Sequence, residues 1–261
     1  MELEIRNATL GYPGRPVLRN VNLKLHAGRT TCLIGPNGAG KTTLFRSMLG
    51  ILPLLQGEIL LEGKNIRAWP RRRFAQAVAC VPQAHSLPFA FTALEVVLFG
   101  RSAHLPFFAS PGKKDRQIAE ACMERLRIGA LRDRIFARLS GGEQQLVMVA
   151  RALAQQPVFL MMDEPSSHLD FGNQVKLIRQ VNALKDDSLG ILMATHSPDH
   201  AFMCGAEVAV VHRGAVRPQG DCNRVITEAV LKEVYGVEVK ICSVEESSPD
   251  RVRKICLPTG F

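Results

Sequence analysis

The sequence predicts an α/β fold with a helical insertion, and three observations indicate it. A glycine-rich loop joins a short apolar segment to a segment of helical periodicity around residue 40. Strand-like segments occur up to residue 81 and return only from residue 158. The stretch between them, about 87–156, has helical character. The strands on both sides are therefore expected to build one core, into which this stretch is inserted as a helical subdomain.

The predicted strands are short apolar or alternating segments punctuated by glycines. In chain order they are expected at 2–6, 21–25, 30–34, 58–61, 77–81, 158–162, 191–194 and 208–211. The first helix is expected to follow the glycine-rich loop and to end near Gly50. Within the insertion, DRQIAEACMERLRI has apolar residues near helical spacing, whereas 102–114 contains two prolines and a glycine, which is typical of a surface loop.

The glycine-rich loop matches the phosphate-binding pattern G-x-x-x-x-G-K-[ST] at every fixed position. Its glycines let backbone N–H groups surround a phosphate, and the positive end of the following helix adds to that field. Lys41 is expected to reach the β- and γ-phosphates of a nucleotide, and the Thr42 hydroxyl to ligate Mg²⁺. The candidate nucleotide-binding residues are Gly35, Pro36, Asn37, Gly38, Ala39, Gly40, Lys41, Thr42 and Thr43.

Two adjacent carboxylates follow the predicted strand at 158–162. A buried strand that ends in acids delivers them to the edge where open α/β sheets bind ligands. We assign Asp163 to the Mg²⁺ shell and Glu164 to polarising the attacking water. A plain strand exit with solvated acids is the alternative, and the phosphate loop upstream makes it the weaker one.

A second candidate anion site occurs in LSGGEQQLVMVARALAQQ. Ser140 and Glu143 form a capping box ahead of an amphipathic helix, which by itself describes a well-capped core helix. Gly141 and Gly142 do not fit that description, because each glycine costs up to about 1 kcal/mol relative to alanine within a helix. We therefore expect something to approach this backbone closely, as an anion does at a helix N-terminus.

Composition excludes several classes of protein. The 261-residue chain is 46% hydrophobic, so it can bury a substantial core. Its seven cysteines are scattered without a C-x-x-C pair, which argues against zinc sites and disulfide scaffolds and favours a reducing cytosolic compartment. The charged, alternating start reads as a strand and not a signal peptide, and no run of eighteen apolar residues occurs. The net charge of +9 fits nucleic acid, anionic lipid or nucleotide, so charge alone decides nothing.

The motifs GPNGAGKTT, VPQ, LSGGEQQ, LMMDEP, SSHLD and ATHS occur in the order and spacing of ATP-binding-cassette (ABC) transporter ATPases, which this chain resembles to about Gly236. The resemblance implies a RecA-like P-loop NTPase core, an antiparallel β subdomain and a helical signature subdomain. It implies an ABC ATPase domain at 1–236, with its core at about 1–86 and 157–236, its helical subdomain at about 87–156, and a short tail at 237–261. In that family two copies face head to tail, and the Ser140, Gly141 and Gly142 segment of one copy closes on the ATP held by the other.

The resemblance also assigns roles to four further residues. Gln83 matches the glutamine that senses Mg²⁺ and water, and His196 matches the switch histidine at the γ-phosphate. Asp170 matches an acid that communicates across the dimer. Tyr12 occupies the place of an aromatic that stacks on adenine, although a tyrosine near a strand end is more often a packing residue. Ala39, Gln144 and Leu146 depart from common family residues without removing a phosphate ligand.

The segment after Gln83, together with LDFGNQ and LKEVYGVEVKI, resembles importer ATPases for iron-siderophore, haem, cobalamin and molybdate-type cargo. This implies permease subunits on separate chains, an indirect periplasmic or extracellular substrate-binding protein, and a place at the cytoplasmic face of the membrane, with no nucleic acid expected. Thr92 and Glu95 form another capping box. Phe89 and Phe91 beside it suit a socket for a permease helix, or equally a subdomain that packs on itself.

Two other classes compete with an importer subunit. A soluble ABC ATPase that acts on nucleic acid or ribosomes would account for the positive charge, but such proteins usually carry two cassettes or a long coiled-coil insertion, and neither is visible here. A monomeric P-loop kinase would leave the glycines after Ser140 unexplained.

Overall fold

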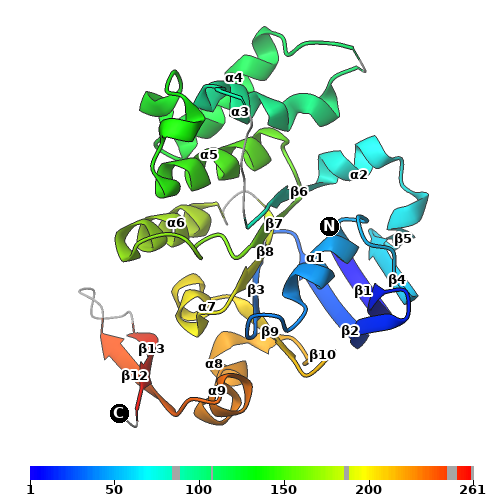
Figure 1. Ribbon diagram of the computed structural model, residues 1–261, viewed down its shortest axis with the longest axis vertical. Coiled ribbons are helices and arrows are strands. Elements are labelled where there is room, and N and C mark those ends of the chain that lie inside the picture. The colour runs from blue at the N-terminus through cyan, green and yellow to red at the C-terminus, as the bar shows by residue number, and fades with distance from the viewer. Residues whose placement is uncertain (84–88, 107, 185–187, 246–251, 260–261) are drawn as a thin grey trace. The chain divides into compact units, whose positions relative to one another are not determined.

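A computed structural model describes residues 1–83, 89–106, 108–184, 188–245 and 252–259 (Figure 1). The chain forms two compact units. The first unit combines Met1–Arg67 with Gly190–Phe261, and the second unit is Ala68–Leu189. The segments 68–83 and 157–184 thus belong to the same unit as the helical insertion, and the expected division at 86/87 lies outside the described residues.

The first unit contains a four-stranded sheet in the order β2-β1-β4-β5. Its strands are β1 (Glu2–Tyr12), β2 (Arg15–His26), β4 (Gln56–Leu61) and β5 (Lys64–Asn65), and every neighbouring pair is antiparallel. Leu3, Ile5, Leu23 and Leu25 are buried, as the alternating pattern of the sequence predicted. The implied antiparallel subdomain is therefore present, with β1 and β2 longer than the sequence indicated.

A parallel set of strands carries the rest of the first unit. β3 (Thr30–Ile34) lies between β8 (Gly190–Thr195) and β9 (Glu207–His212) and is parallel to both. All residues of β3 and β8 are buried, which explains their continuous apolar sequences. The short strands β10 (Ala215–Val216) and β11 (Gly220–Asp221) pair antiparallel with β9. The helices of this unit are α1 (Lys41–Met48), α7 (Pro198–Cys204), α8 (Cys222–Val225) and α9 (Glu228–Tyr235).

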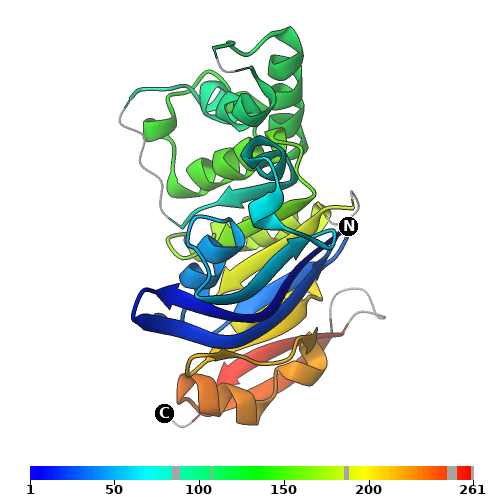
Figure 2. The same ribbon diagram turned by 90° about the vertical axis from the view of Figure 1, so that its right-hand side faces the viewer.

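The segment predicted as a short tail contains a β-hairpin. β12 (Val239–Glu245) pairs antiparallel with β13 (Val252–Pro258) and lies beside α9, as Figure 2 shows. Two carboxylates hold the hairpin, because Glu228 accepts the N–H of Ile241 at 2.9 Å and Asp199 accepts the N–H of Cys256 at 2.8 Å. Asp199 belongs to α7, so the hairpin is fixed to the helix that follows β8.

The second unit joins two parallel strands to a group of helices. β6 (Val78–Val81) pairs with β7 (Phe159–Asp163), and α3 (Ala93–Leu98), α4 (Lys113–Arg125) and α5 (Gly141–Ala154) pack together (Figure 1). This unit also contains α2 (Arg71–Ala77), α6 (Phe171–Ala183) and 3₁₀ turns at Phe99–His104, Gly129–Leu131 and Phe136–Arg138, and a further 3₁₀ turn at Ile66–Ala68 spans the boundary between the units. The predicted loop at 102–114 is thus shorter than expected, because a 3₁₀ turn occupies its start and α4 begins at Lys113.

A buried arginine ties the helical part of the second unit together. Arg101 donates to Asp115 at 2.9 Å, to the carbonyl of Ala154 at 2.7 Å and to Gln156 at 3.0 Å. The pKa of Asp115 lies below its ordinary value, first because of its hydrogen bond from Arg101. These bonds connect the start of α4 to the end of α5. The predicted α/β class, with its antiparallel sheet and helical insertion, is confirmed.

Candidate nucleotide site

The glycine-rich loop lies in the first unit, between the end of β3 and the start of α1. Gly40 caps α1 with a φ of 109°, and a Cβ there would lie 3.0 Å from Val17 and 3.1 Å from Leu18 of β2. A side chain at Gly40 would therefore be strained and crowded. Among the described residues no side chain caps α1, and the sequence of its first turn contains no acid. A helix start without an acid in its first turn suits an anion, because its N–H groups and the helix dipole favour negative charge.

Lys41 is the first residue of α1, directly after the loop, and is only 4% exposed. Its Nζ donates to the carbonyl of Gly35 at 2.7 Å and to that of Pro36 at 3.1 Å. The ammonium is therefore held against the backbone that is expected to surround the phosphates. A phosphate oxygen would give this ammonium a charge-assisted hydrogen bond, which is stronger than a bond to a neutral carbonyl. The neighbouring Thr42 is exposed, as a ligand of a bound cation must be.

Tyr12 is placed at the end of β1, where it pairs with Arg15 of β2. Its side chain is 42% exposed, so it is not a core residue. The strand pair that carries it contacts the loop through Val17 and Leu18, the residues closest to Gly40. This placement leaves the ring accessible for stacking on a base held near the loop, which was the functional alternative for Tyr12.

His196 follows β8 at the edge of the sheet where the glycine-rich loop follows β3. Thr195, the last residue of β8, is the register partner of Ile34, the last residue of β3. Since the two strands are parallel, Gly35 and His196 both follow directly at the carboxyl edge, where α/β sheets bind ligands. His196 is exposed. The first unit therefore brings the phosphate loop and the candidate switch histidine together.

The two candidate acids and Gln83 lie in the second unit. Asp163 ends β7 and Glu164 follows it, and both are buried. Gln83 follows β6, whose Val81 is in register with Met162 of β7. The amide of Gln83 donates to Glu164 at 3.4 Å, a long hydrogen bond. The second unit thus brings together the residues predicted to handle the attacking water.

The backbone at Glu164 has an unusual conformation for a residue with a side chain. Its φ is 49°, in the left-handed region that non-glycine residues rarely adopt. Such conformations cost about 1–3 kcal/mol and persist where the surroundings enforce them, often at active sites. The strain turns the chain sharply after the strand, at the residue predicted to act on water.

The N-terminus of α5 contains the predicted capping box. Ser140 accepts the N–H of Glu143 at 3.4 Å, and Glu143 accepts the N–H of Ser140 at 2.9 Å and its hydroxyl at 2.8 Å. These hydrogen bonds lower the pKa of Glu143, the backbone bond most. The hydroxyl that was predicted to meet an anion is therefore already engaged by a carboxylate within the chain.

The two glycines after Ser140 have different surroundings. A Cβ at Gly142 would lie 2.5 Å from the side chain of Asn173 in α6, whereas the nearest atoms at Gly141 are 3.9 Å away. The close approach predicted at this helix start is thus made, at Gly142, by a residue of the same chain. Gly141 is exposed and leaves room for a ligand from outside.

Asp170 caps α6 and determines where Asn173 lies. It accepts the N–H of Asn173 at 2.8 Å and its side-chain amide at 2.8 Å. Asp170 therefore acts on the start of α5 through Asn173, which sequence reasoning did not single out. The pattern D-x-x-N at a helix start would have predicted the cap, but not the contact with Gly142, since that contact joins two helices.

The candidate metal ligands are an oxygen set. Thr42 offers a hydroxyl, Gln83 an amide oxygen and Asp163 a carboxylate, which are ligands that Mg²⁺ prefers. Within the described residues there is no group of three or more histidine, cysteine or acidic side chains that could hold a metal ion. The chemistry of these three oxygen ligands fits Mg²⁺.

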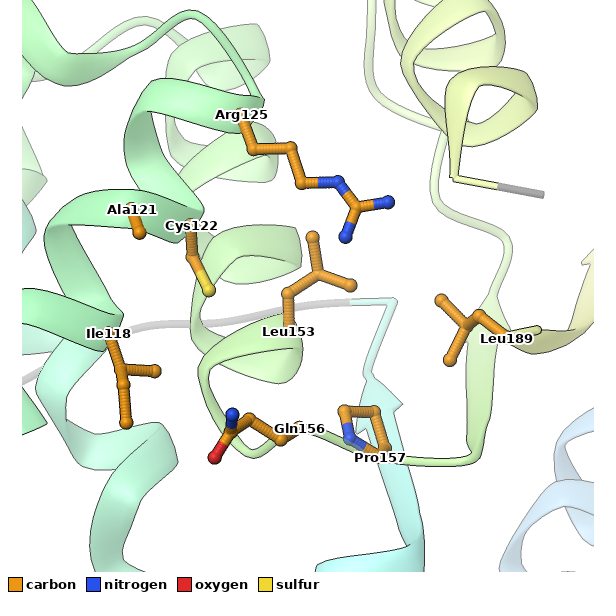
Figure 3. Close-up of a pocket in the computed structure, with 8 residues that line it drawn as sticks. All are labelled: Ile118, Ala121, Cys122, Arg125, Leu153, Gln156, Pro157 and Leu189. Carbon is orange, nitrogen blue, oxygen red and sulfur yellow. The ribbon is translucent and has the colours of Figure 1, made fainter. Parts of the chain in front are cut away.

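A pocket of about 390 Å³ lies elsewhere in the second unit (Figure 3). Ile118, Cys122 and Arg125 of α4 line one side of it, and Leu153 and Pro157 line another. None of the predicted site residues lines this pocket, so it is separate from the candidate site. A search of the described residues for a helix long and apolar enough to span a membrane finds none.

Comparison with known proteins adds independent findings. The family model described as "ABC transporter" matches residues 18–167. An uncharacterized ABC transporter ATP-binding protein of Haemophilus influenzae is 37% identical over 90% of this chain and 89% of its own. The iron(3+)-hydroxamate import ATP-binding protein of Bacillus subtilis is 31% identical over 95% of this chain and 91% of its own. A solved structure, an inward-facing putative metal-chelate type ABC transporter, superposes with a TM-score of 0.86 at 26% identity, covering 99% of this chain and 97% of that one.

Proposed function

We propose, because the chain belongs to the family of ABC transporter ATP-binding proteins, that it is the ATP-hydrolysing motor subunit of a prokaryotic importer for metal-chelate or related cargo. The ATPase proposal rests on the loop before α1. No described side chain caps α1 there, and the ammonium of Lys41 lies against the carbonyl of Gly35 in the same loop. The cargo class rests on the relatives, whose names specify iron-hydroxamate import and metal-chelate transport.

In the proposed reaction the first unit binds the nucleotide. Backbone N–H groups from Asn37 to Thr43 surround the phosphates, Lys41 contacts the β- and γ-phosphates, and Tyr12 stacks on the adenine. Thr42, Gln83 and Asp163 would hold Mg²⁺, which when bound neutralises charge that develops on the phosphates. Their oxygen chemistry supports this ligand set.

Hydrolysis is proposed to depend on three side chains around the attacking water. Glu164 accepts a proton from this water, and its buried carboxylate is held near Gln83 for that purpose. Gln83 orients the water, and His196 donates to the γ-phosphate as negative charge develops there. The strained backbone at Glu164 supports this role, because strain that folding tolerates is often retained for function.

The second helix start is proposed to act on a nucleotide bound by another copy of the chain. Ser140, Gly141 and Gly142 of one copy would close on the γ-phosphate held by the other, in a head-to-tail dimer, and Asp170 would contribute to that interface. The open surroundings of Gly141 support this proposal, since an anion can reach its backbone from outside.

Permease subunits on separate chains are the second proposed partner. Phe89 and Phe91, which precede α3, and Phe99, which follows it, form an aromatic cluster in which the ring centroids of Phe89 and Phe91 are 5.9 Å apart and those of Phe91 and Phe99 are 4.9 Å apart. Although these rings pack on one another, Phe89 remains 68% and Phe99 38% exposed. An exposed aromatic cluster suits a partner's helix, which would hold this subunit at the cytoplasmic face of the membrane, with a substrate-binding protein contributing indirectly.

The ATPase proposal is tested by binding and turnover of the purified chain. Lys41→Ala removes a charge-assisted hydrogen bond of about 1.5–3 kcal/mol, so the Kd for MgATP should rise about ten- to a hundred-fold. Lys176→Ala, which removes an exposed lysine of α6, is the matched control and should bind normally. Equal affinity of the two variants would contradict the assignment of the loop.

The importer proposal is tested by co-expression with the membrane protein encoded nearest to this chain. The subunit should co-purify with that protein in detergent, and cells carrying both should accumulate radiolabelled ferric hydroxamate or another metal chelate. Replacing Phe89 and Phe91 by Ser should abolish co-purification and uptake while ATP binding is retained. Uptake at the normal rate by this double variant would favour the self-packing alternative.

A further inference from the structure

His200 lies under the loop that carries the candidate switch histidine. Its Nδ1 is 2.9 Å from the hydroxyl of Thr195, and the same hydroxyl accepts the N–H of Ser197 at 3.1 Å. Thr195 is 1% and His200 7% exposed, whereas His196 is exposed. The buried hydroxyl of Thr195 therefore accepts a hydrogen bond from Ser197, and these two residues flank His196.

Two groups engage the Thr195 hydroxyl at the same time. Burial lowers the pKa of His200, and the nearby His196 lowers it further, so the imidazole is neutral near pH 7. The Thr195 hydroxyl has one proton and two lone pairs, so it can accept the N–H of Ser197 and form a hydrogen bond with Nδ1 of a neutral His200 in either tautomer. The Thr195 side chain cannot move away from either partner without losing a buried hydrogen bond.

The helix that carries His200 is itself fixed. α7 begins at Pro198 and packs against β3 and β13. Asp199, next to His200, accepts the N–H of Cys256 from the C-terminal hairpin at 2.8 Å. His200 thus belongs to a helix that packs on both sides, and it contacts the loop through the Thr195 hydroxyl.

We propose that His200 is a positioning residue for ATP hydrolysis, which holds His196 at the γ-phosphate by fixing the Thr195 hydroxyl beneath the loop. The proposal rests on the proposed role of His196 and goes beyond it, since it assigns a function to a buried histidine four residues further along. His200 makes no contact with the nucleotide in this account, so its effect must pass through the loop.

A His200→Leu variant removes the hydrogen bond while keeping an apolar side chain of similar size in the core. We expect kcat to fall about three- to ten-fold, the rate equivalent of one neutral hydrogen bond, with the Kd for ATP unchanged. His200→Asn retains an oxygen near the position of Nδ1 and should restore most of the rate. A residue that only fills the core would give an equal rate for both variants, or losses that follow thermal stability, and either result would overturn the proposal.

A double-mutant cycle with His196→Ala tests whether the effect passes through the switch histidine. If His200 acts through His196, His200→Leu should cost nothing further once His196 is absent. An additional three- to ten-fold loss in that background, about the same as in the unmodified chain, would show that His200 acts elsewhere. If His196→Ala alone retains normal turnover, the proposed role of His196 is wrong and this proposal falls with it, whereas normal turnover of His200→Leu alone leaves the role of His196 intact.

Discussion

The helices α1 and α5 both begin with glycine-containing segments suited to anions, but the side chains at the two helix starts differ. At α1 no described side chain provides a cap, the first turn lacks an acid, and Lys41 adds a positive charge. At α5 Ser140 caps the helix and Glu143 places a carboxylate in the first turn. Every helix start presents N–H groups without a partner inside the helix, and a capping box satisfies some of them at α5, whereas no described side chain caps α1.

This difference predicts that the starts of α1 and α5 have different roles in phosphate binding. α1 can recruit a phosphate by itself, because its first turn contains no acid, no described side chain caps it, and Lys41 adds a positive charge. At α5 an arriving phosphate meets the Glu143 carboxylate and must compete for the Ser140 hydroxyl. We infer that α5 adds to the binding of a phosphate already held elsewhere, which is what a site shared between two copies requires.

The largest expected effect separates binding at α1 from the chemistry that follows. Glu164→Gln keeps the loop and its N–H groups but removes the carboxylate that accepts a proton from water. Turnover should fall by about 10²–10⁴-fold while MgATP binds as before, measured by phosphate release and by equilibrium binding. Turnover near the normal rate would mean that another residue serves as the base.

The next effect distinguishes the two glycines at the start of α5. Gly142→Ala places a methyl group 2.5 Å from Asn173 and should lower the free energy of unfolding by about 1–3 kcal/mol, measured by denaturant unfolding. Gly141→Ala is the matched control, since its surroundings are open and stability should change little. Asn173→Ala combined with Gly142→Ala should recover part of the loss, and equal destabilisation by both single variants would contradict the packing described here.

These glycines also show what the sequence could and could not predict. The capping boxes at Ser140 and Thr92 were predicted and are confirmed, because such boxes are formed within four consecutive residues. The loop before α1 was equally local. The contact of Asn173 with Gly142, and that of His200 with Thr195, depend on how a helix packs against its neighbour, which spacing along one element does not specify.

The C-terminal hairpin was missed for a related reason. Val239 and Ile241 alternate with polar residues, as a strand would, but the segment was too short and too polar to be assigned without a partner. Strand β13 supplies that partner, and two carboxylates from α7 and α9 supply further bonds. The roles of the individual site residues remain predictions, since they concern a ligand and a second copy.

The smallest expected effect concerns the carboxylate at the start of α5. Glu143→Gln keeps the capping box but removes the charge, so helix stability should fall slightly while ATP trapping in the Glu164→Gln background improves about two- to five-fold. The pKa of Glu143 is lowered on folding from its ordinary value of 4.5. Its contribution to stability is therefore complete above pH 4.5 and is lost as the pH falls through the folded-state pKa. Thermal unfolding of the variant between pH 7 and pH 3 should show a smaller acid-induced loss than the unmodified chain.

The central claim is that α1 of one copy and α5 of another act on the same nucleotide, and mixed dimers in the Glu164→Gln background test it most directly. Pairing a Lys41→Ala chain with a Ser140→Arg chain places both defects in one shared site and leaves the other intact, so such dimers should trap about one ATP each. A chain with both substitutions, paired with a chain that lacks them, places one defect in each site and should trap almost none. If each copy instead built its own complete site, the pattern would be reversed, and trapping only by the second pairing would contradict the account.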